Sequence, residues 1–289
     1  MSAVEASGRE AGMQDTTLLA AHDVTVRFGG VVALDNVSLS VPEGSTVGLV
    51  GPNGAGKTTL FGVLSGLLRP KAGRVTMGGV DVTRRSPQHR AGKGLSRTFQ
   101  RMELFTELTV REHLVLARRV REGRERLLGM ARDLTGFGER PGPGEESAVA
   151  EILALLGLES VADRPALAIP LGTGRLLEVA RALASEPTVM LLDEPSSGLD
   201  VHETEQLGEA LRRVRSERGT AFVLVEHNVE FVLGLSDRIT VLDFGKLLVE
   251  GTPDEIRISP EVQAAYFGAP LEDRARDETG PDETGEEQS

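Results

Sequence analysis

Residues 51–58 read GPNGAGKT and match the pattern G-x-x-x-x-G-K-[S/T] at every fixed position. An apolar run precedes them and a helical pattern follows, so the segment joins a strand to a helix. Backbone N–H groups in such a loop point at an anion, the helix dipole favours negative charge, and Lys57 adds a mobile positive charge. We therefore expect a cradle for nucleotide phosphates rather than a glycine-rich turn with a solvated lysine. The predicted binding residues are Gly51, Pro52, Asn53, Gly54, Ala55, Gly56, Lys57, Thr58 and Thr59.

Two adjacent carboxylates end a second apolar run, at 189–192. At the end of such a strand Asp193 can hold Mg²⁺ beside the phosphate loop, directly or through water, together with the hydroxyl of Thr58. Glu194 is placed to orient, or to take a proton from, a water that attacks the γ-phosphate. Two neighbouring acids are usually solvated surface groups, but a phosphate loop in the same chain favours the catalytic interpretation.

Composition limits the other possibilities. Of the 289 residues 39% are hydrophobic, but only 3% are aromatic and none is Trp, so we expect an aliphatic core. The absence of Cys excludes disulfides, thiolate metal sites and cysteine nucleophiles. A net charge of −12 argues against general nucleic-acid binding. No apolar run reaches the roughly 20 residues that a membrane span needs, and the first residues lack a signal pattern, so we expect a cytoplasmic protein, soluble or peripheral on a membrane.

The order of the expected elements predicts an α/β fold. Two strands within 18–41 flank Gly29-Gly30, and a second hairpin is centred on Gly78-Gly79. Near-continuous apolar runs at 188–192 and 220–225 are typical of buried parallel strands. Further strands are expected at 238–242 and 246–249, and helices at 58–68, from the capping box at Thr109 to about 135, at 148–156, at 173–184 and from Ser259 to near Gly268.

We expect one folded domain between two disordered ends. Residues 1–17 and the acidic tail 271–289 have too few apolar residues to bury a core. Residues 18–270 then form the folded domain, with a helical insertion at about 101–175. A loop rich in Pro, Gly and Glu is expected at 136–146 within that insertion.

The order of the motifs resembles that of an ATP-binding cassette (ABC) ATPase over roughly residues 18–270. The motifs are GPNGAGKT, Gln100, LLDEP at 191–195, Ser197-Gly198-Leu199-Asp200 and His227. The resemblance implies a P-loop NTPase fold with a RecA-like parallel-sheet core, an N-terminal antiparallel β subdomain and a helical subdomain. It also implies ATP and Mg²⁺ as cofactors, and a head-to-tail dimer in which each ATP lies between one subunit's phosphate loop and the other's signature helix.

The resemblance also assigns roles to single residues. Phe28 corresponds to the aromatic that stacks on adenine, and Gln100 to the loop glutamine that contacts Mg²⁺ and water. Asp200 corresponds to an acid that crosses the dimer interface, and His227 to the switch histidine near the γ-phosphate. Each residue also has a plainer alternative. Phe28 could be a core aromatic and Gln100 a loop amide without a ligand. Asp200 could be a helix cap completed by Glu203, and His227 a structural histidine. The expected catalytic residues are Lys57, Glu194 and His227.

The signature segment departs from the family pattern LSGGQ. Counting back eleven residues from A-R-A-L at 180–183 places it at Ile169-Pro170-Leu171-Gly172-Thr173. A register over 171–175 would delete two residues and turn the downstream helix face by about 200°, so we reject it. Pro170 replaces the serine that would bind a γ-phosphate and has no N–H, and Leu171 replaces the first glycine. Gly172 alone remains to bind nucleotide.

The weak signature segment predicts an asymmetric assembly. It would complete the ATP site on the partner's phosphate loop, and that site should bind or hydrolyse ATP poorly. This chain's own site keeps its catalytic residues and needs a strong signature from another subunit. We therefore expect a heterodimer with a second ABC ATPase subunit. A homodimer, in which Gly172 and the helix dipole suffice, is the alternative.

Within ABC ATPases, several segments resemble those of branched-chain (hydrophobic) amino acid importers. They are SRTFQ at 96–100, LF at 104–105, LTV at 108–110, VEHN at 225–228, VLDFGK at 241–246, EGTP at 250–253 and AYFG at 265–268. This implies transmembrane permease subunits as partners, indirectly a substrate-binding protein, no nucleic acid, and a place on the inner face of the cell membrane. The alternatives are a urea or amide importer, a lipid exporter, or a regulatory subunit that hydrolyses ATP poorly.

Overall fold

The computed structural model describes residues 16–98, 104–123 and 142–267. The strands in these ranges form two sheets, one antiparallel and one mostly parallel. None of the helices described there has both the length and the apolar composition of a membrane span.

The antiparallel sheet begins with a long hairpin. Strands β1 (Thr17–Phe28) and β2 (Val31–Pro42) pair across the turn at Gly29-Gly30. β4 (Ala72–Met77) pairs with the other edge of β1, and β5 (Val80–Asp81) extends the order to β2-β1-β4-β5. Both predicted hairpins are confirmed, and the first strand starts at Thr17, one residue before the predicted start of the folded domain.

The second sheet supplies the core of the fold. Its strands are β3 (Thr46–Val50), β6 (Leu95–Arg97), β7 (Val189–Asp193), β8 (Ala221–Val225), β9 (Arg238–Asp243) and β10 (Lys246–Gly251). Their spatial order is β10-β9-β3-β8-β7-β6; β10 runs antiparallel to β9 and the other pairs are parallel. Every residue of β3, β7 and β8 is buried, which explains their near-continuous apolar runs. The predicted parallel strands are confirmed.

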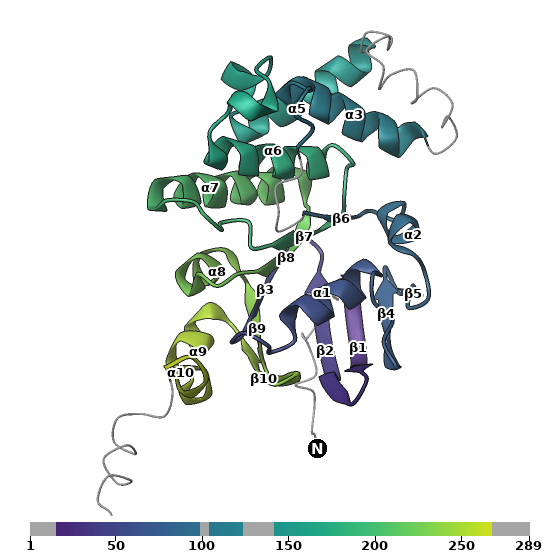
Figure 1. The fold of residues 1–289 in the computed structure, drawn as a ribbon, viewed down its shortest axis with the longest axis vertical. Helices are drawn as coiled ribbons and strands as arrows, with labels where there is room; N and C mark the ends of the chain where they lie inside the picture. The colour runs from purple at the N-terminus through teal and green to yellow at the C-terminus, as the bar shows by residue number, and fades with distance from the viewer. Residues whose placement is uncertain (1–15, 99–103, 124–141, 268–289) are drawn as a thin grey trace, which may run out of the picture.

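Helices cover both sheets. The longer ones are α1 (Lys57–Ser65), α3 (Val110–Glu122), α5 (Pro143–Leu156), α6 (Leu171–Leu183) and α7 (Val201–Arg218), and the shorter ones are α2 (Pro87–Ala91), α8 (Val229–Leu235), α9 (Pro253–Ile258) and α10 (Pro260–Phe267). In Figure 1, α3, α5 and α6 lie together at the top, beyond α7, and α1 lies beside the antiparallel sheet. This arrangement confirms the predicted α/β fold class. The domain limits at 18, 101, 175 and 270 stay a prediction.

Two apolar clusters lie on opposite faces of the mostly parallel sheet. Because side chains alternate along a strand, neighbouring residues of β8 divide between them. Val223 and Val225 pack with α1 and the antiparallel sheet, whereas Phe222 and Leu224 pack with α6 and α7. Aliphatic side chains dominate both clusters, as the composition predicts.

Some helix ends differ from the sequence prediction. α1 ends at Ser65 rather than at residue 68, because Gly66 takes a left-handed φ of 84° and its N–H caps a helix carbonyl. α5 begins at Pro143, inside the loop predicted at 136–146, because Pro at the first turn followed by acidic residues suits a helix start. The capping box at Thr109 is confirmed, and the part of that helix predicted beyond residue 123 lies outside the described residues. The elements for which we predicted no range are β6, α2, α7, α8, α9 and the two 3₁₀ helices at Glu159–Val161 and Ala166–Ala168.

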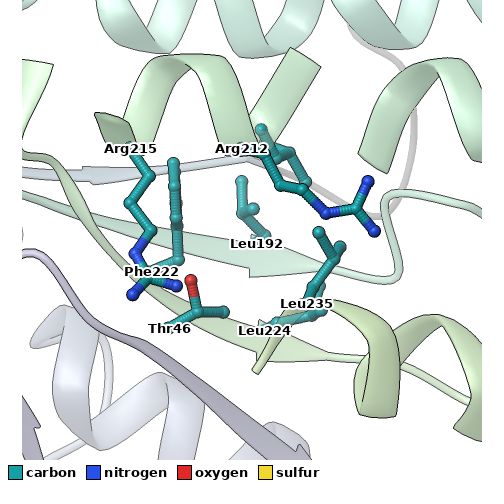
Figure 2. Close-up of a pocket in the computed structure, with 8 residues that line it drawn as sticks. Thr46, Leu192, Arg212, Arg215, Phe222, Leu224 and Leu235 are labelled. Carbon is teal, nitrogen blue, oxygen red and sulfur yellow. The ribbon is translucent and has the colours of Figure 1, made fainter. Parts of the chain in front are cut away.

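Figure 2 shows the seam between α7 and the mostly parallel sheet. The guanidinium of Arg215 donates to the carbonyl of Gly44 (2.6 Å) and to Oδ1 of Asp237 (2.8 Å), while Oδ2 of Asp237 accepts the N–H of Thr46 (2.7 Å). A small apolar cavity in this seam reaches Thr46 at the amino end of β3, whereas the phosphate loop follows the carboxyl end. The cavity is therefore a feature of helix packing. Its remaining lining residues are Leu192, Leu211, Arg212, Phe222, Leu224 and Leu235.

A buried arginine caps α1, the helix that follows the phosphate loop. Arg90 is 1% exposed, and one terminal nitrogen donates to the carbonyls of Val63 and Leu64 (both 2.6 Å) while the other donates to the carbonyl of Val82 (2.8 Å). Carbonyls in the last turn of a helix lack intrahelical donors, so Arg90 supplies one to Leu64 and adds a second to Val63, which also accepts the N–H of Gly66. Burial lowers the pKa of Arg90 to about 10, with the charge of Asp81 opposing, so the guanidinium stays charged at neutral pH and complements the helix dipole.

We expect Arg90→Met to lower the free energy of unfolding by about 1–3 kcal/mol, because it leaves the carbonyl of Leu64 without its donor, whereas the carbonyls of Val63 and Val82 keep the N–H groups of Gly66 and Arg85. Denaturant unfolding followed by circular dichroism measures the change. The matched control is Arg74→Met at an exposed position of β4, which should change stability by less than about 0.5 kcal/mol. Equal stability of the two variants would contradict the capping role.

Candidate nucleotide-binding site

Three neighbouring parallel strands end at one edge of the sheet, and a predicted motif follows each. β8 lies between β3 and β7, with Leu49 and Asp193 both paired with Val225. The phosphate loop follows β3, His227 follows β8 by two residues, and Glu194 follows β7 directly. Segments separated by more than a hundred residues in the chain are therefore neighbours at this edge.

Two glycines of the phosphate loop are required by packing as well as by ligand access. Gly51 has a φ of 149°, and a Cβ there would lie 2.2 Å from the carbonyl oxygen of Leu242. Gly56 has a φ of 105°, and a Cβ there would lie 2.8 Å from the carbonyl oxygen of Ala33. The loop thus packs directly against β2 and β9, and a side chain at either glycine would displace it.

Lys57 lies inside the phosphate loop, with its amino group against the loop backbone. Its Nζ donates to the carbonyls of Gly51 (2.5 Å) and Pro52 (3.1 Å), and the residue is 7% exposed. Burial lowers the pKa of Lys57, and the negative charge of Glu194 opposes this shift. A bound phosphate would offer the ammonium a charged acceptor in place of neutral carbonyls, and charge-assisted hydrogen bonds are the stronger ones. The loop therefore favours an anion.

The oxygen donors at this edge fit a magnesium ion. Asp193 is buried, and its Oδ2 accepts from the guanidinium of Arg97 at 3.0 Å. Burial raises the pKa of Asp193, and the charge of Arg97 opposes this shift. The carboxylate of Asp193 and the exposed hydroxyl of Thr58, in the first turn of α1, are the hard oxygen ligands that Mg²⁺ takes. Gln100, the third predicted ligand, lies outside the described residues.

Glu194 and His227 form a hydrogen-bonded pair. Nε2 of His227 lies 2.9 Å from Oε1 of Glu194. Glu194 has a φ of 47°, unusual for a residue other than glycine, and its N–H donates to the carbonyl of Val225 (2.8 Å). Strained backbone of this kind is concentrated at functional sites, because the surrounding structure has to hold it in place.

A residue that the sequence analysis did not single out ties the two motifs together. Glu226 is 3% exposed, and its carboxylate accepts the N–H of Ser196 (2.7 Å) and the N–H of His227 (3.1 Å). It thereby joins the chain leaving β7 to the chain leaving β8. The available signal was an acid directly after an apolar strand, the same signal that marked Asp193.

The adenine-stacking prediction concerns Phe28, at the tip of the first hairpin. Phe28 is 51% exposed, so the alternative that it belongs to the core is wrong. It pairs with Val31, two residues before the Ala33 carbonyl that lies against Gly56. The tip of the hairpin therefore lies close to the phosphate loop, and stacking on adenine stays a prediction.

The predicted signature segment starts α6 and contacts α7. Pro170 is the N-cap residue, so the helix begins at Leu171 rather than at Thr173 as predicted. The N–H of Gly172 donates to Oε1 of Glu203 (3.2 Å). A Cβ on Gly172 would lie 2.6 Å from the same oxygen, so any other residue here would require the Glu203 side chain to move.

Asp200 begins α7 as part of a capping box. Its side chain accepts the N–H of Glu203 (2.8 Å), and Oε2 of Glu203 accepts the N–H of Asp200 (3.2 Å). The helix-cap alternative for Asp200 is therefore confirmed, and its contact across a dimer interface stays a prediction. Oε1 of Glu203 thus accepts a hydrogen bond from α6, and Oε2 accepts one from the N-cap of its own helix.

A phosphate loop at the end of β3, with two carboxylates and a histidine at the ends of neighbouring strands, defines a P-loop NTPase. Residues 34–197, more than half of the chain, match the family described as ABC transporter. The chain belongs to this family and is an ABC-type ATPase, as the order of its motifs predicts.

Two curated relatives match most of this chain. LivG of Salmonella typhimurium, described as a high-affinity branched-chain amino acid transport ATP-binding protein, is 39% identical over 251 residues, which cover 87% of this chain and 98% of LivG. BraF of Pseudomonas aeruginosa, also described as a high-affinity branched-chain amino acid transport ATP-binding protein, is 37% identical over 252 residues, which cover 87% of this chain and 98% of BraF.

A solved structure confirms the fold. MJ1267, described as an ATP-binding cassette of an ABC transporter in its ADP conformation, superposes with a TM-score of 0.77 at 29% sequence identity. The match covers 87% of this chain and 99% of MJ1267.

The role of Asp200 as a helix cap can be tested without the proposed dimer. Asparagine can cap a helix as aspartate does but has no charge, so we expect Asp200→Asn to keep the stability of the protein. We expect Asp200→Ala to lose about 1 kcal/mol, because it removes the cap. Thermal unfolding of both variants measures this. If Asp200→Asn were as unstable as Asp200→Ala, the capping box would not explain the local stability.

Proposed function

We propose that this chain is the ATP-hydrolysing subunit of an importer of branched-chain amino acids. The observation that supports hydrolysis is the Glu194–His227 hydrogen bond at the edge of the sheet that carries the phosphate loop. The cargo is supported by LivG and BraF, which are both described as branched-chain amino acid transport proteins and match 87% of this chain.

The proposed chemistry follows from where these groups lie. Lys57 and the N–H groups of the phosphate loop bind the β- and γ-phosphates and stabilise the charge that develops during transfer. Glu194, as a carboxylate, orients a water and takes its proton. Nε2–H of His227, which donates to Glu194 in this structure, would turn to the γ-phosphate when nucleotide is bound. Asp193 and Thr58 would hold Mg²⁺, which neutralises charge on the phosphate oxygens when it is bound.

We expect Glu194→Gln to lower ATP turnover by at least about 100-fold while ATP still binds, because the amide keeps the shape of the side chain but cannot take a proton. Phosphate release measures turnover, and equilibrium dialysis with Mg·ATP measures binding. The control is Glu217→Gln on the exposed face of α7, which removes the same charge and should leave both unchanged. Normal turnover in Glu194→Gln would refute the assigned role.

We further propose a heterodimer with a second ABC ATPase subunit. Three features of the α6 N-terminus support it. Pro170 has no N–H, Leu171 places a half-exposed apolar side chain where the family has glycine, and the N–H of Gly172 already donates to Glu203. A γ-phosphate at this end would have to displace that carboxylate, so the site on the partner's phosphate loop should be the weak one.

We expect the purified chain to hydrolyse ATP slowly alone and about ten-fold or more faster with the second ATPase subunit of the same transporter, since each lost hydrogen bond to a charged group is worth about 1.5–3 kcal/mol. Turnover is measured for each subunit and for the mixture. Lys57→Ala in this chain should remove most of the activity of the mixture, which tests whether the working site is on this chain. Brisk turnover by this chain alone, equal to the mixture, would support the homodimer alternative instead.

The proposed importer function also implies further partners. We propose that the chain binds transmembrane permease subunits at the inner face of the cell membrane, that a substrate-binding protein acts on the same transporter indirectly, and that nucleic acid is not a partner. The relatives, described as transport ATP-binding proteins, support the permease, and the net charge of −12 supports the last point.

A further inference from the structure

Arg97 is brought to Asp193 by the pairing of an edge strand. β6 pairs in parallel with β7, with Arg97 opposite Leu191, and the N–H of Thr98 donates to the carbonyl of Leu191 (2.9 Å). The N–H of Asp193 lies 3.4 Å from the hydroxyl oxygen of Thr98. The pairing of the two backbones therefore sets the distance between the Cα atoms of Arg97 and Asp193.

The guanidinium of Arg97 is held on its other side by α1. Its Cζ lies 4.9 Å from the ring centroid of Phe61, which is fully buried, and a terminal nitrogen donates to the hydroxyl of Ser65 (3.3 Å). The side chain of Arg97 is 17% exposed. A cation stacked on an aromatic face and hydrogen-bonded at a second point has little freedom to move. Arg97 is therefore a fixed part of the site between α1 and β7.

The contact uses only part of the Asp193 carboxylate. One terminal nitrogen of Arg97 contacts Oδ2 at 3.0 Å. A carboxylate has two oxygens and about four positions at which it can accept, so this pairing is compatible with a metal ligand role for Asp193. The Asp193 side chain is 9% exposed, and a carboxylate buried to this extent requires a nearby positive charge.

We infer that Arg97 is a positioning residue for the metal ion of the nucleotide site: it holds the Asp193 carboxylate in the orientation in which Asp193 binds the metal. This inference rests on the proposed function, which places Mg²⁺ at Asp193 and Thr58. The opposite role, a cation that occupies the place of Mg²⁺ and must leave, would suit a mobile and exposed side chain. The contacts to Phe61 and Ser65 argue against it.

The test measures metal affinity directly, with Mn²⁺ as a paramagnetic probe for Mg²⁺. Free Mn²⁺ is quantified by electron paramagnetic resonance as it is titrated into the full chain with a non-hydrolysable ATP analogue. A fluorescent ATP analogue in EDTA gives metal-free nucleotide affinity. We expect Arg97→Met to weaken Mn²⁺ binding by about 10- to 100-fold, the usual effect of losing a residue that orients a metal ligand, with metal-free nucleotide binding unchanged.

Two further variants complete the test. Arg111→Met on α3 removes the same charge and a surface ion pair with Asp163, and should leave Mn²⁺ affinity unchanged. Arg97→Lys keeps the charge but lacks the planar guanidinium that contacts Asp193 and Ser65 together, so it should also weaken Mn²⁺ binding. If Arg97→Met does not fold, the Mn²⁺ affinity of Arg97→Lys is the measurement that tests the inference. Unchanged or tighter Mn²⁺ binding in the folded Arg97 variant would overturn the inference. If the wild-type chain bound nucleotide but no Mn²⁺, the proposed metal site itself would fail.

Discussion

The parallel register of β3, β8 and β7 is the constraint on which the site depends. These strands are buried on both faces, and their backbone hydrogen bonds align Leu49, Val225 and Asp193 across the sheet. A slip of one residue would turn every side chain of a strand to the opposite face. In β7 it would exchange the faces of Leu191 and Leu192, which pack in different clusters, and would remove Asp193 from the edge. The packing of the core therefore also fixes the geometry of the chemistry.

Three charged side chains that are buried or largely buried connect the elements that form and support this edge. Glu226 joins the ends of β7 and β8, Arg97 joins β7 to α1, and Arg90 closes the other end of α1. A buried charge is costly unless it is paired or hydrogen-bonded, so each of these side chains has few alternative positions. Rigid connections of this kind suit a site in which hydrolysis requires fixed distances between several groups.

The contact between α6 and α7 connects the predicted signature segment to Asp200 through Glu203. Glu203 accepts from Gly172 on one helix and from Asp200 on the other. Arg175 of α6 adds a hydrogen bond to the carbonyl of Ser197 (3.2 Å). In the proposed dimer both segments face the partner, so these contacts within one chain set how its α6 N-terminus can meet a nucleotide on the other chain.

The sequence by itself determined the phosphate loop, the carboxylates that end β7 and the two hairpins, because each is encoded by contiguous residues with a local pattern of glycines, apolar runs or turn residues. It also placed His227, although only through the family order of motifs. The tertiary structure decided what holds these groups. The partners of Arg97, Glu226 and Glu203 lie 96, 30 and 31 residues away in the chain, at Asp193, Ser196 and Gly172. No local pattern encodes such pairings, because they arise only when strands align in a sheet and helices pack on it. The same reason explains why the short strand β6, which carries Arg97, was not predicted: its three residues form a strand only beside β7.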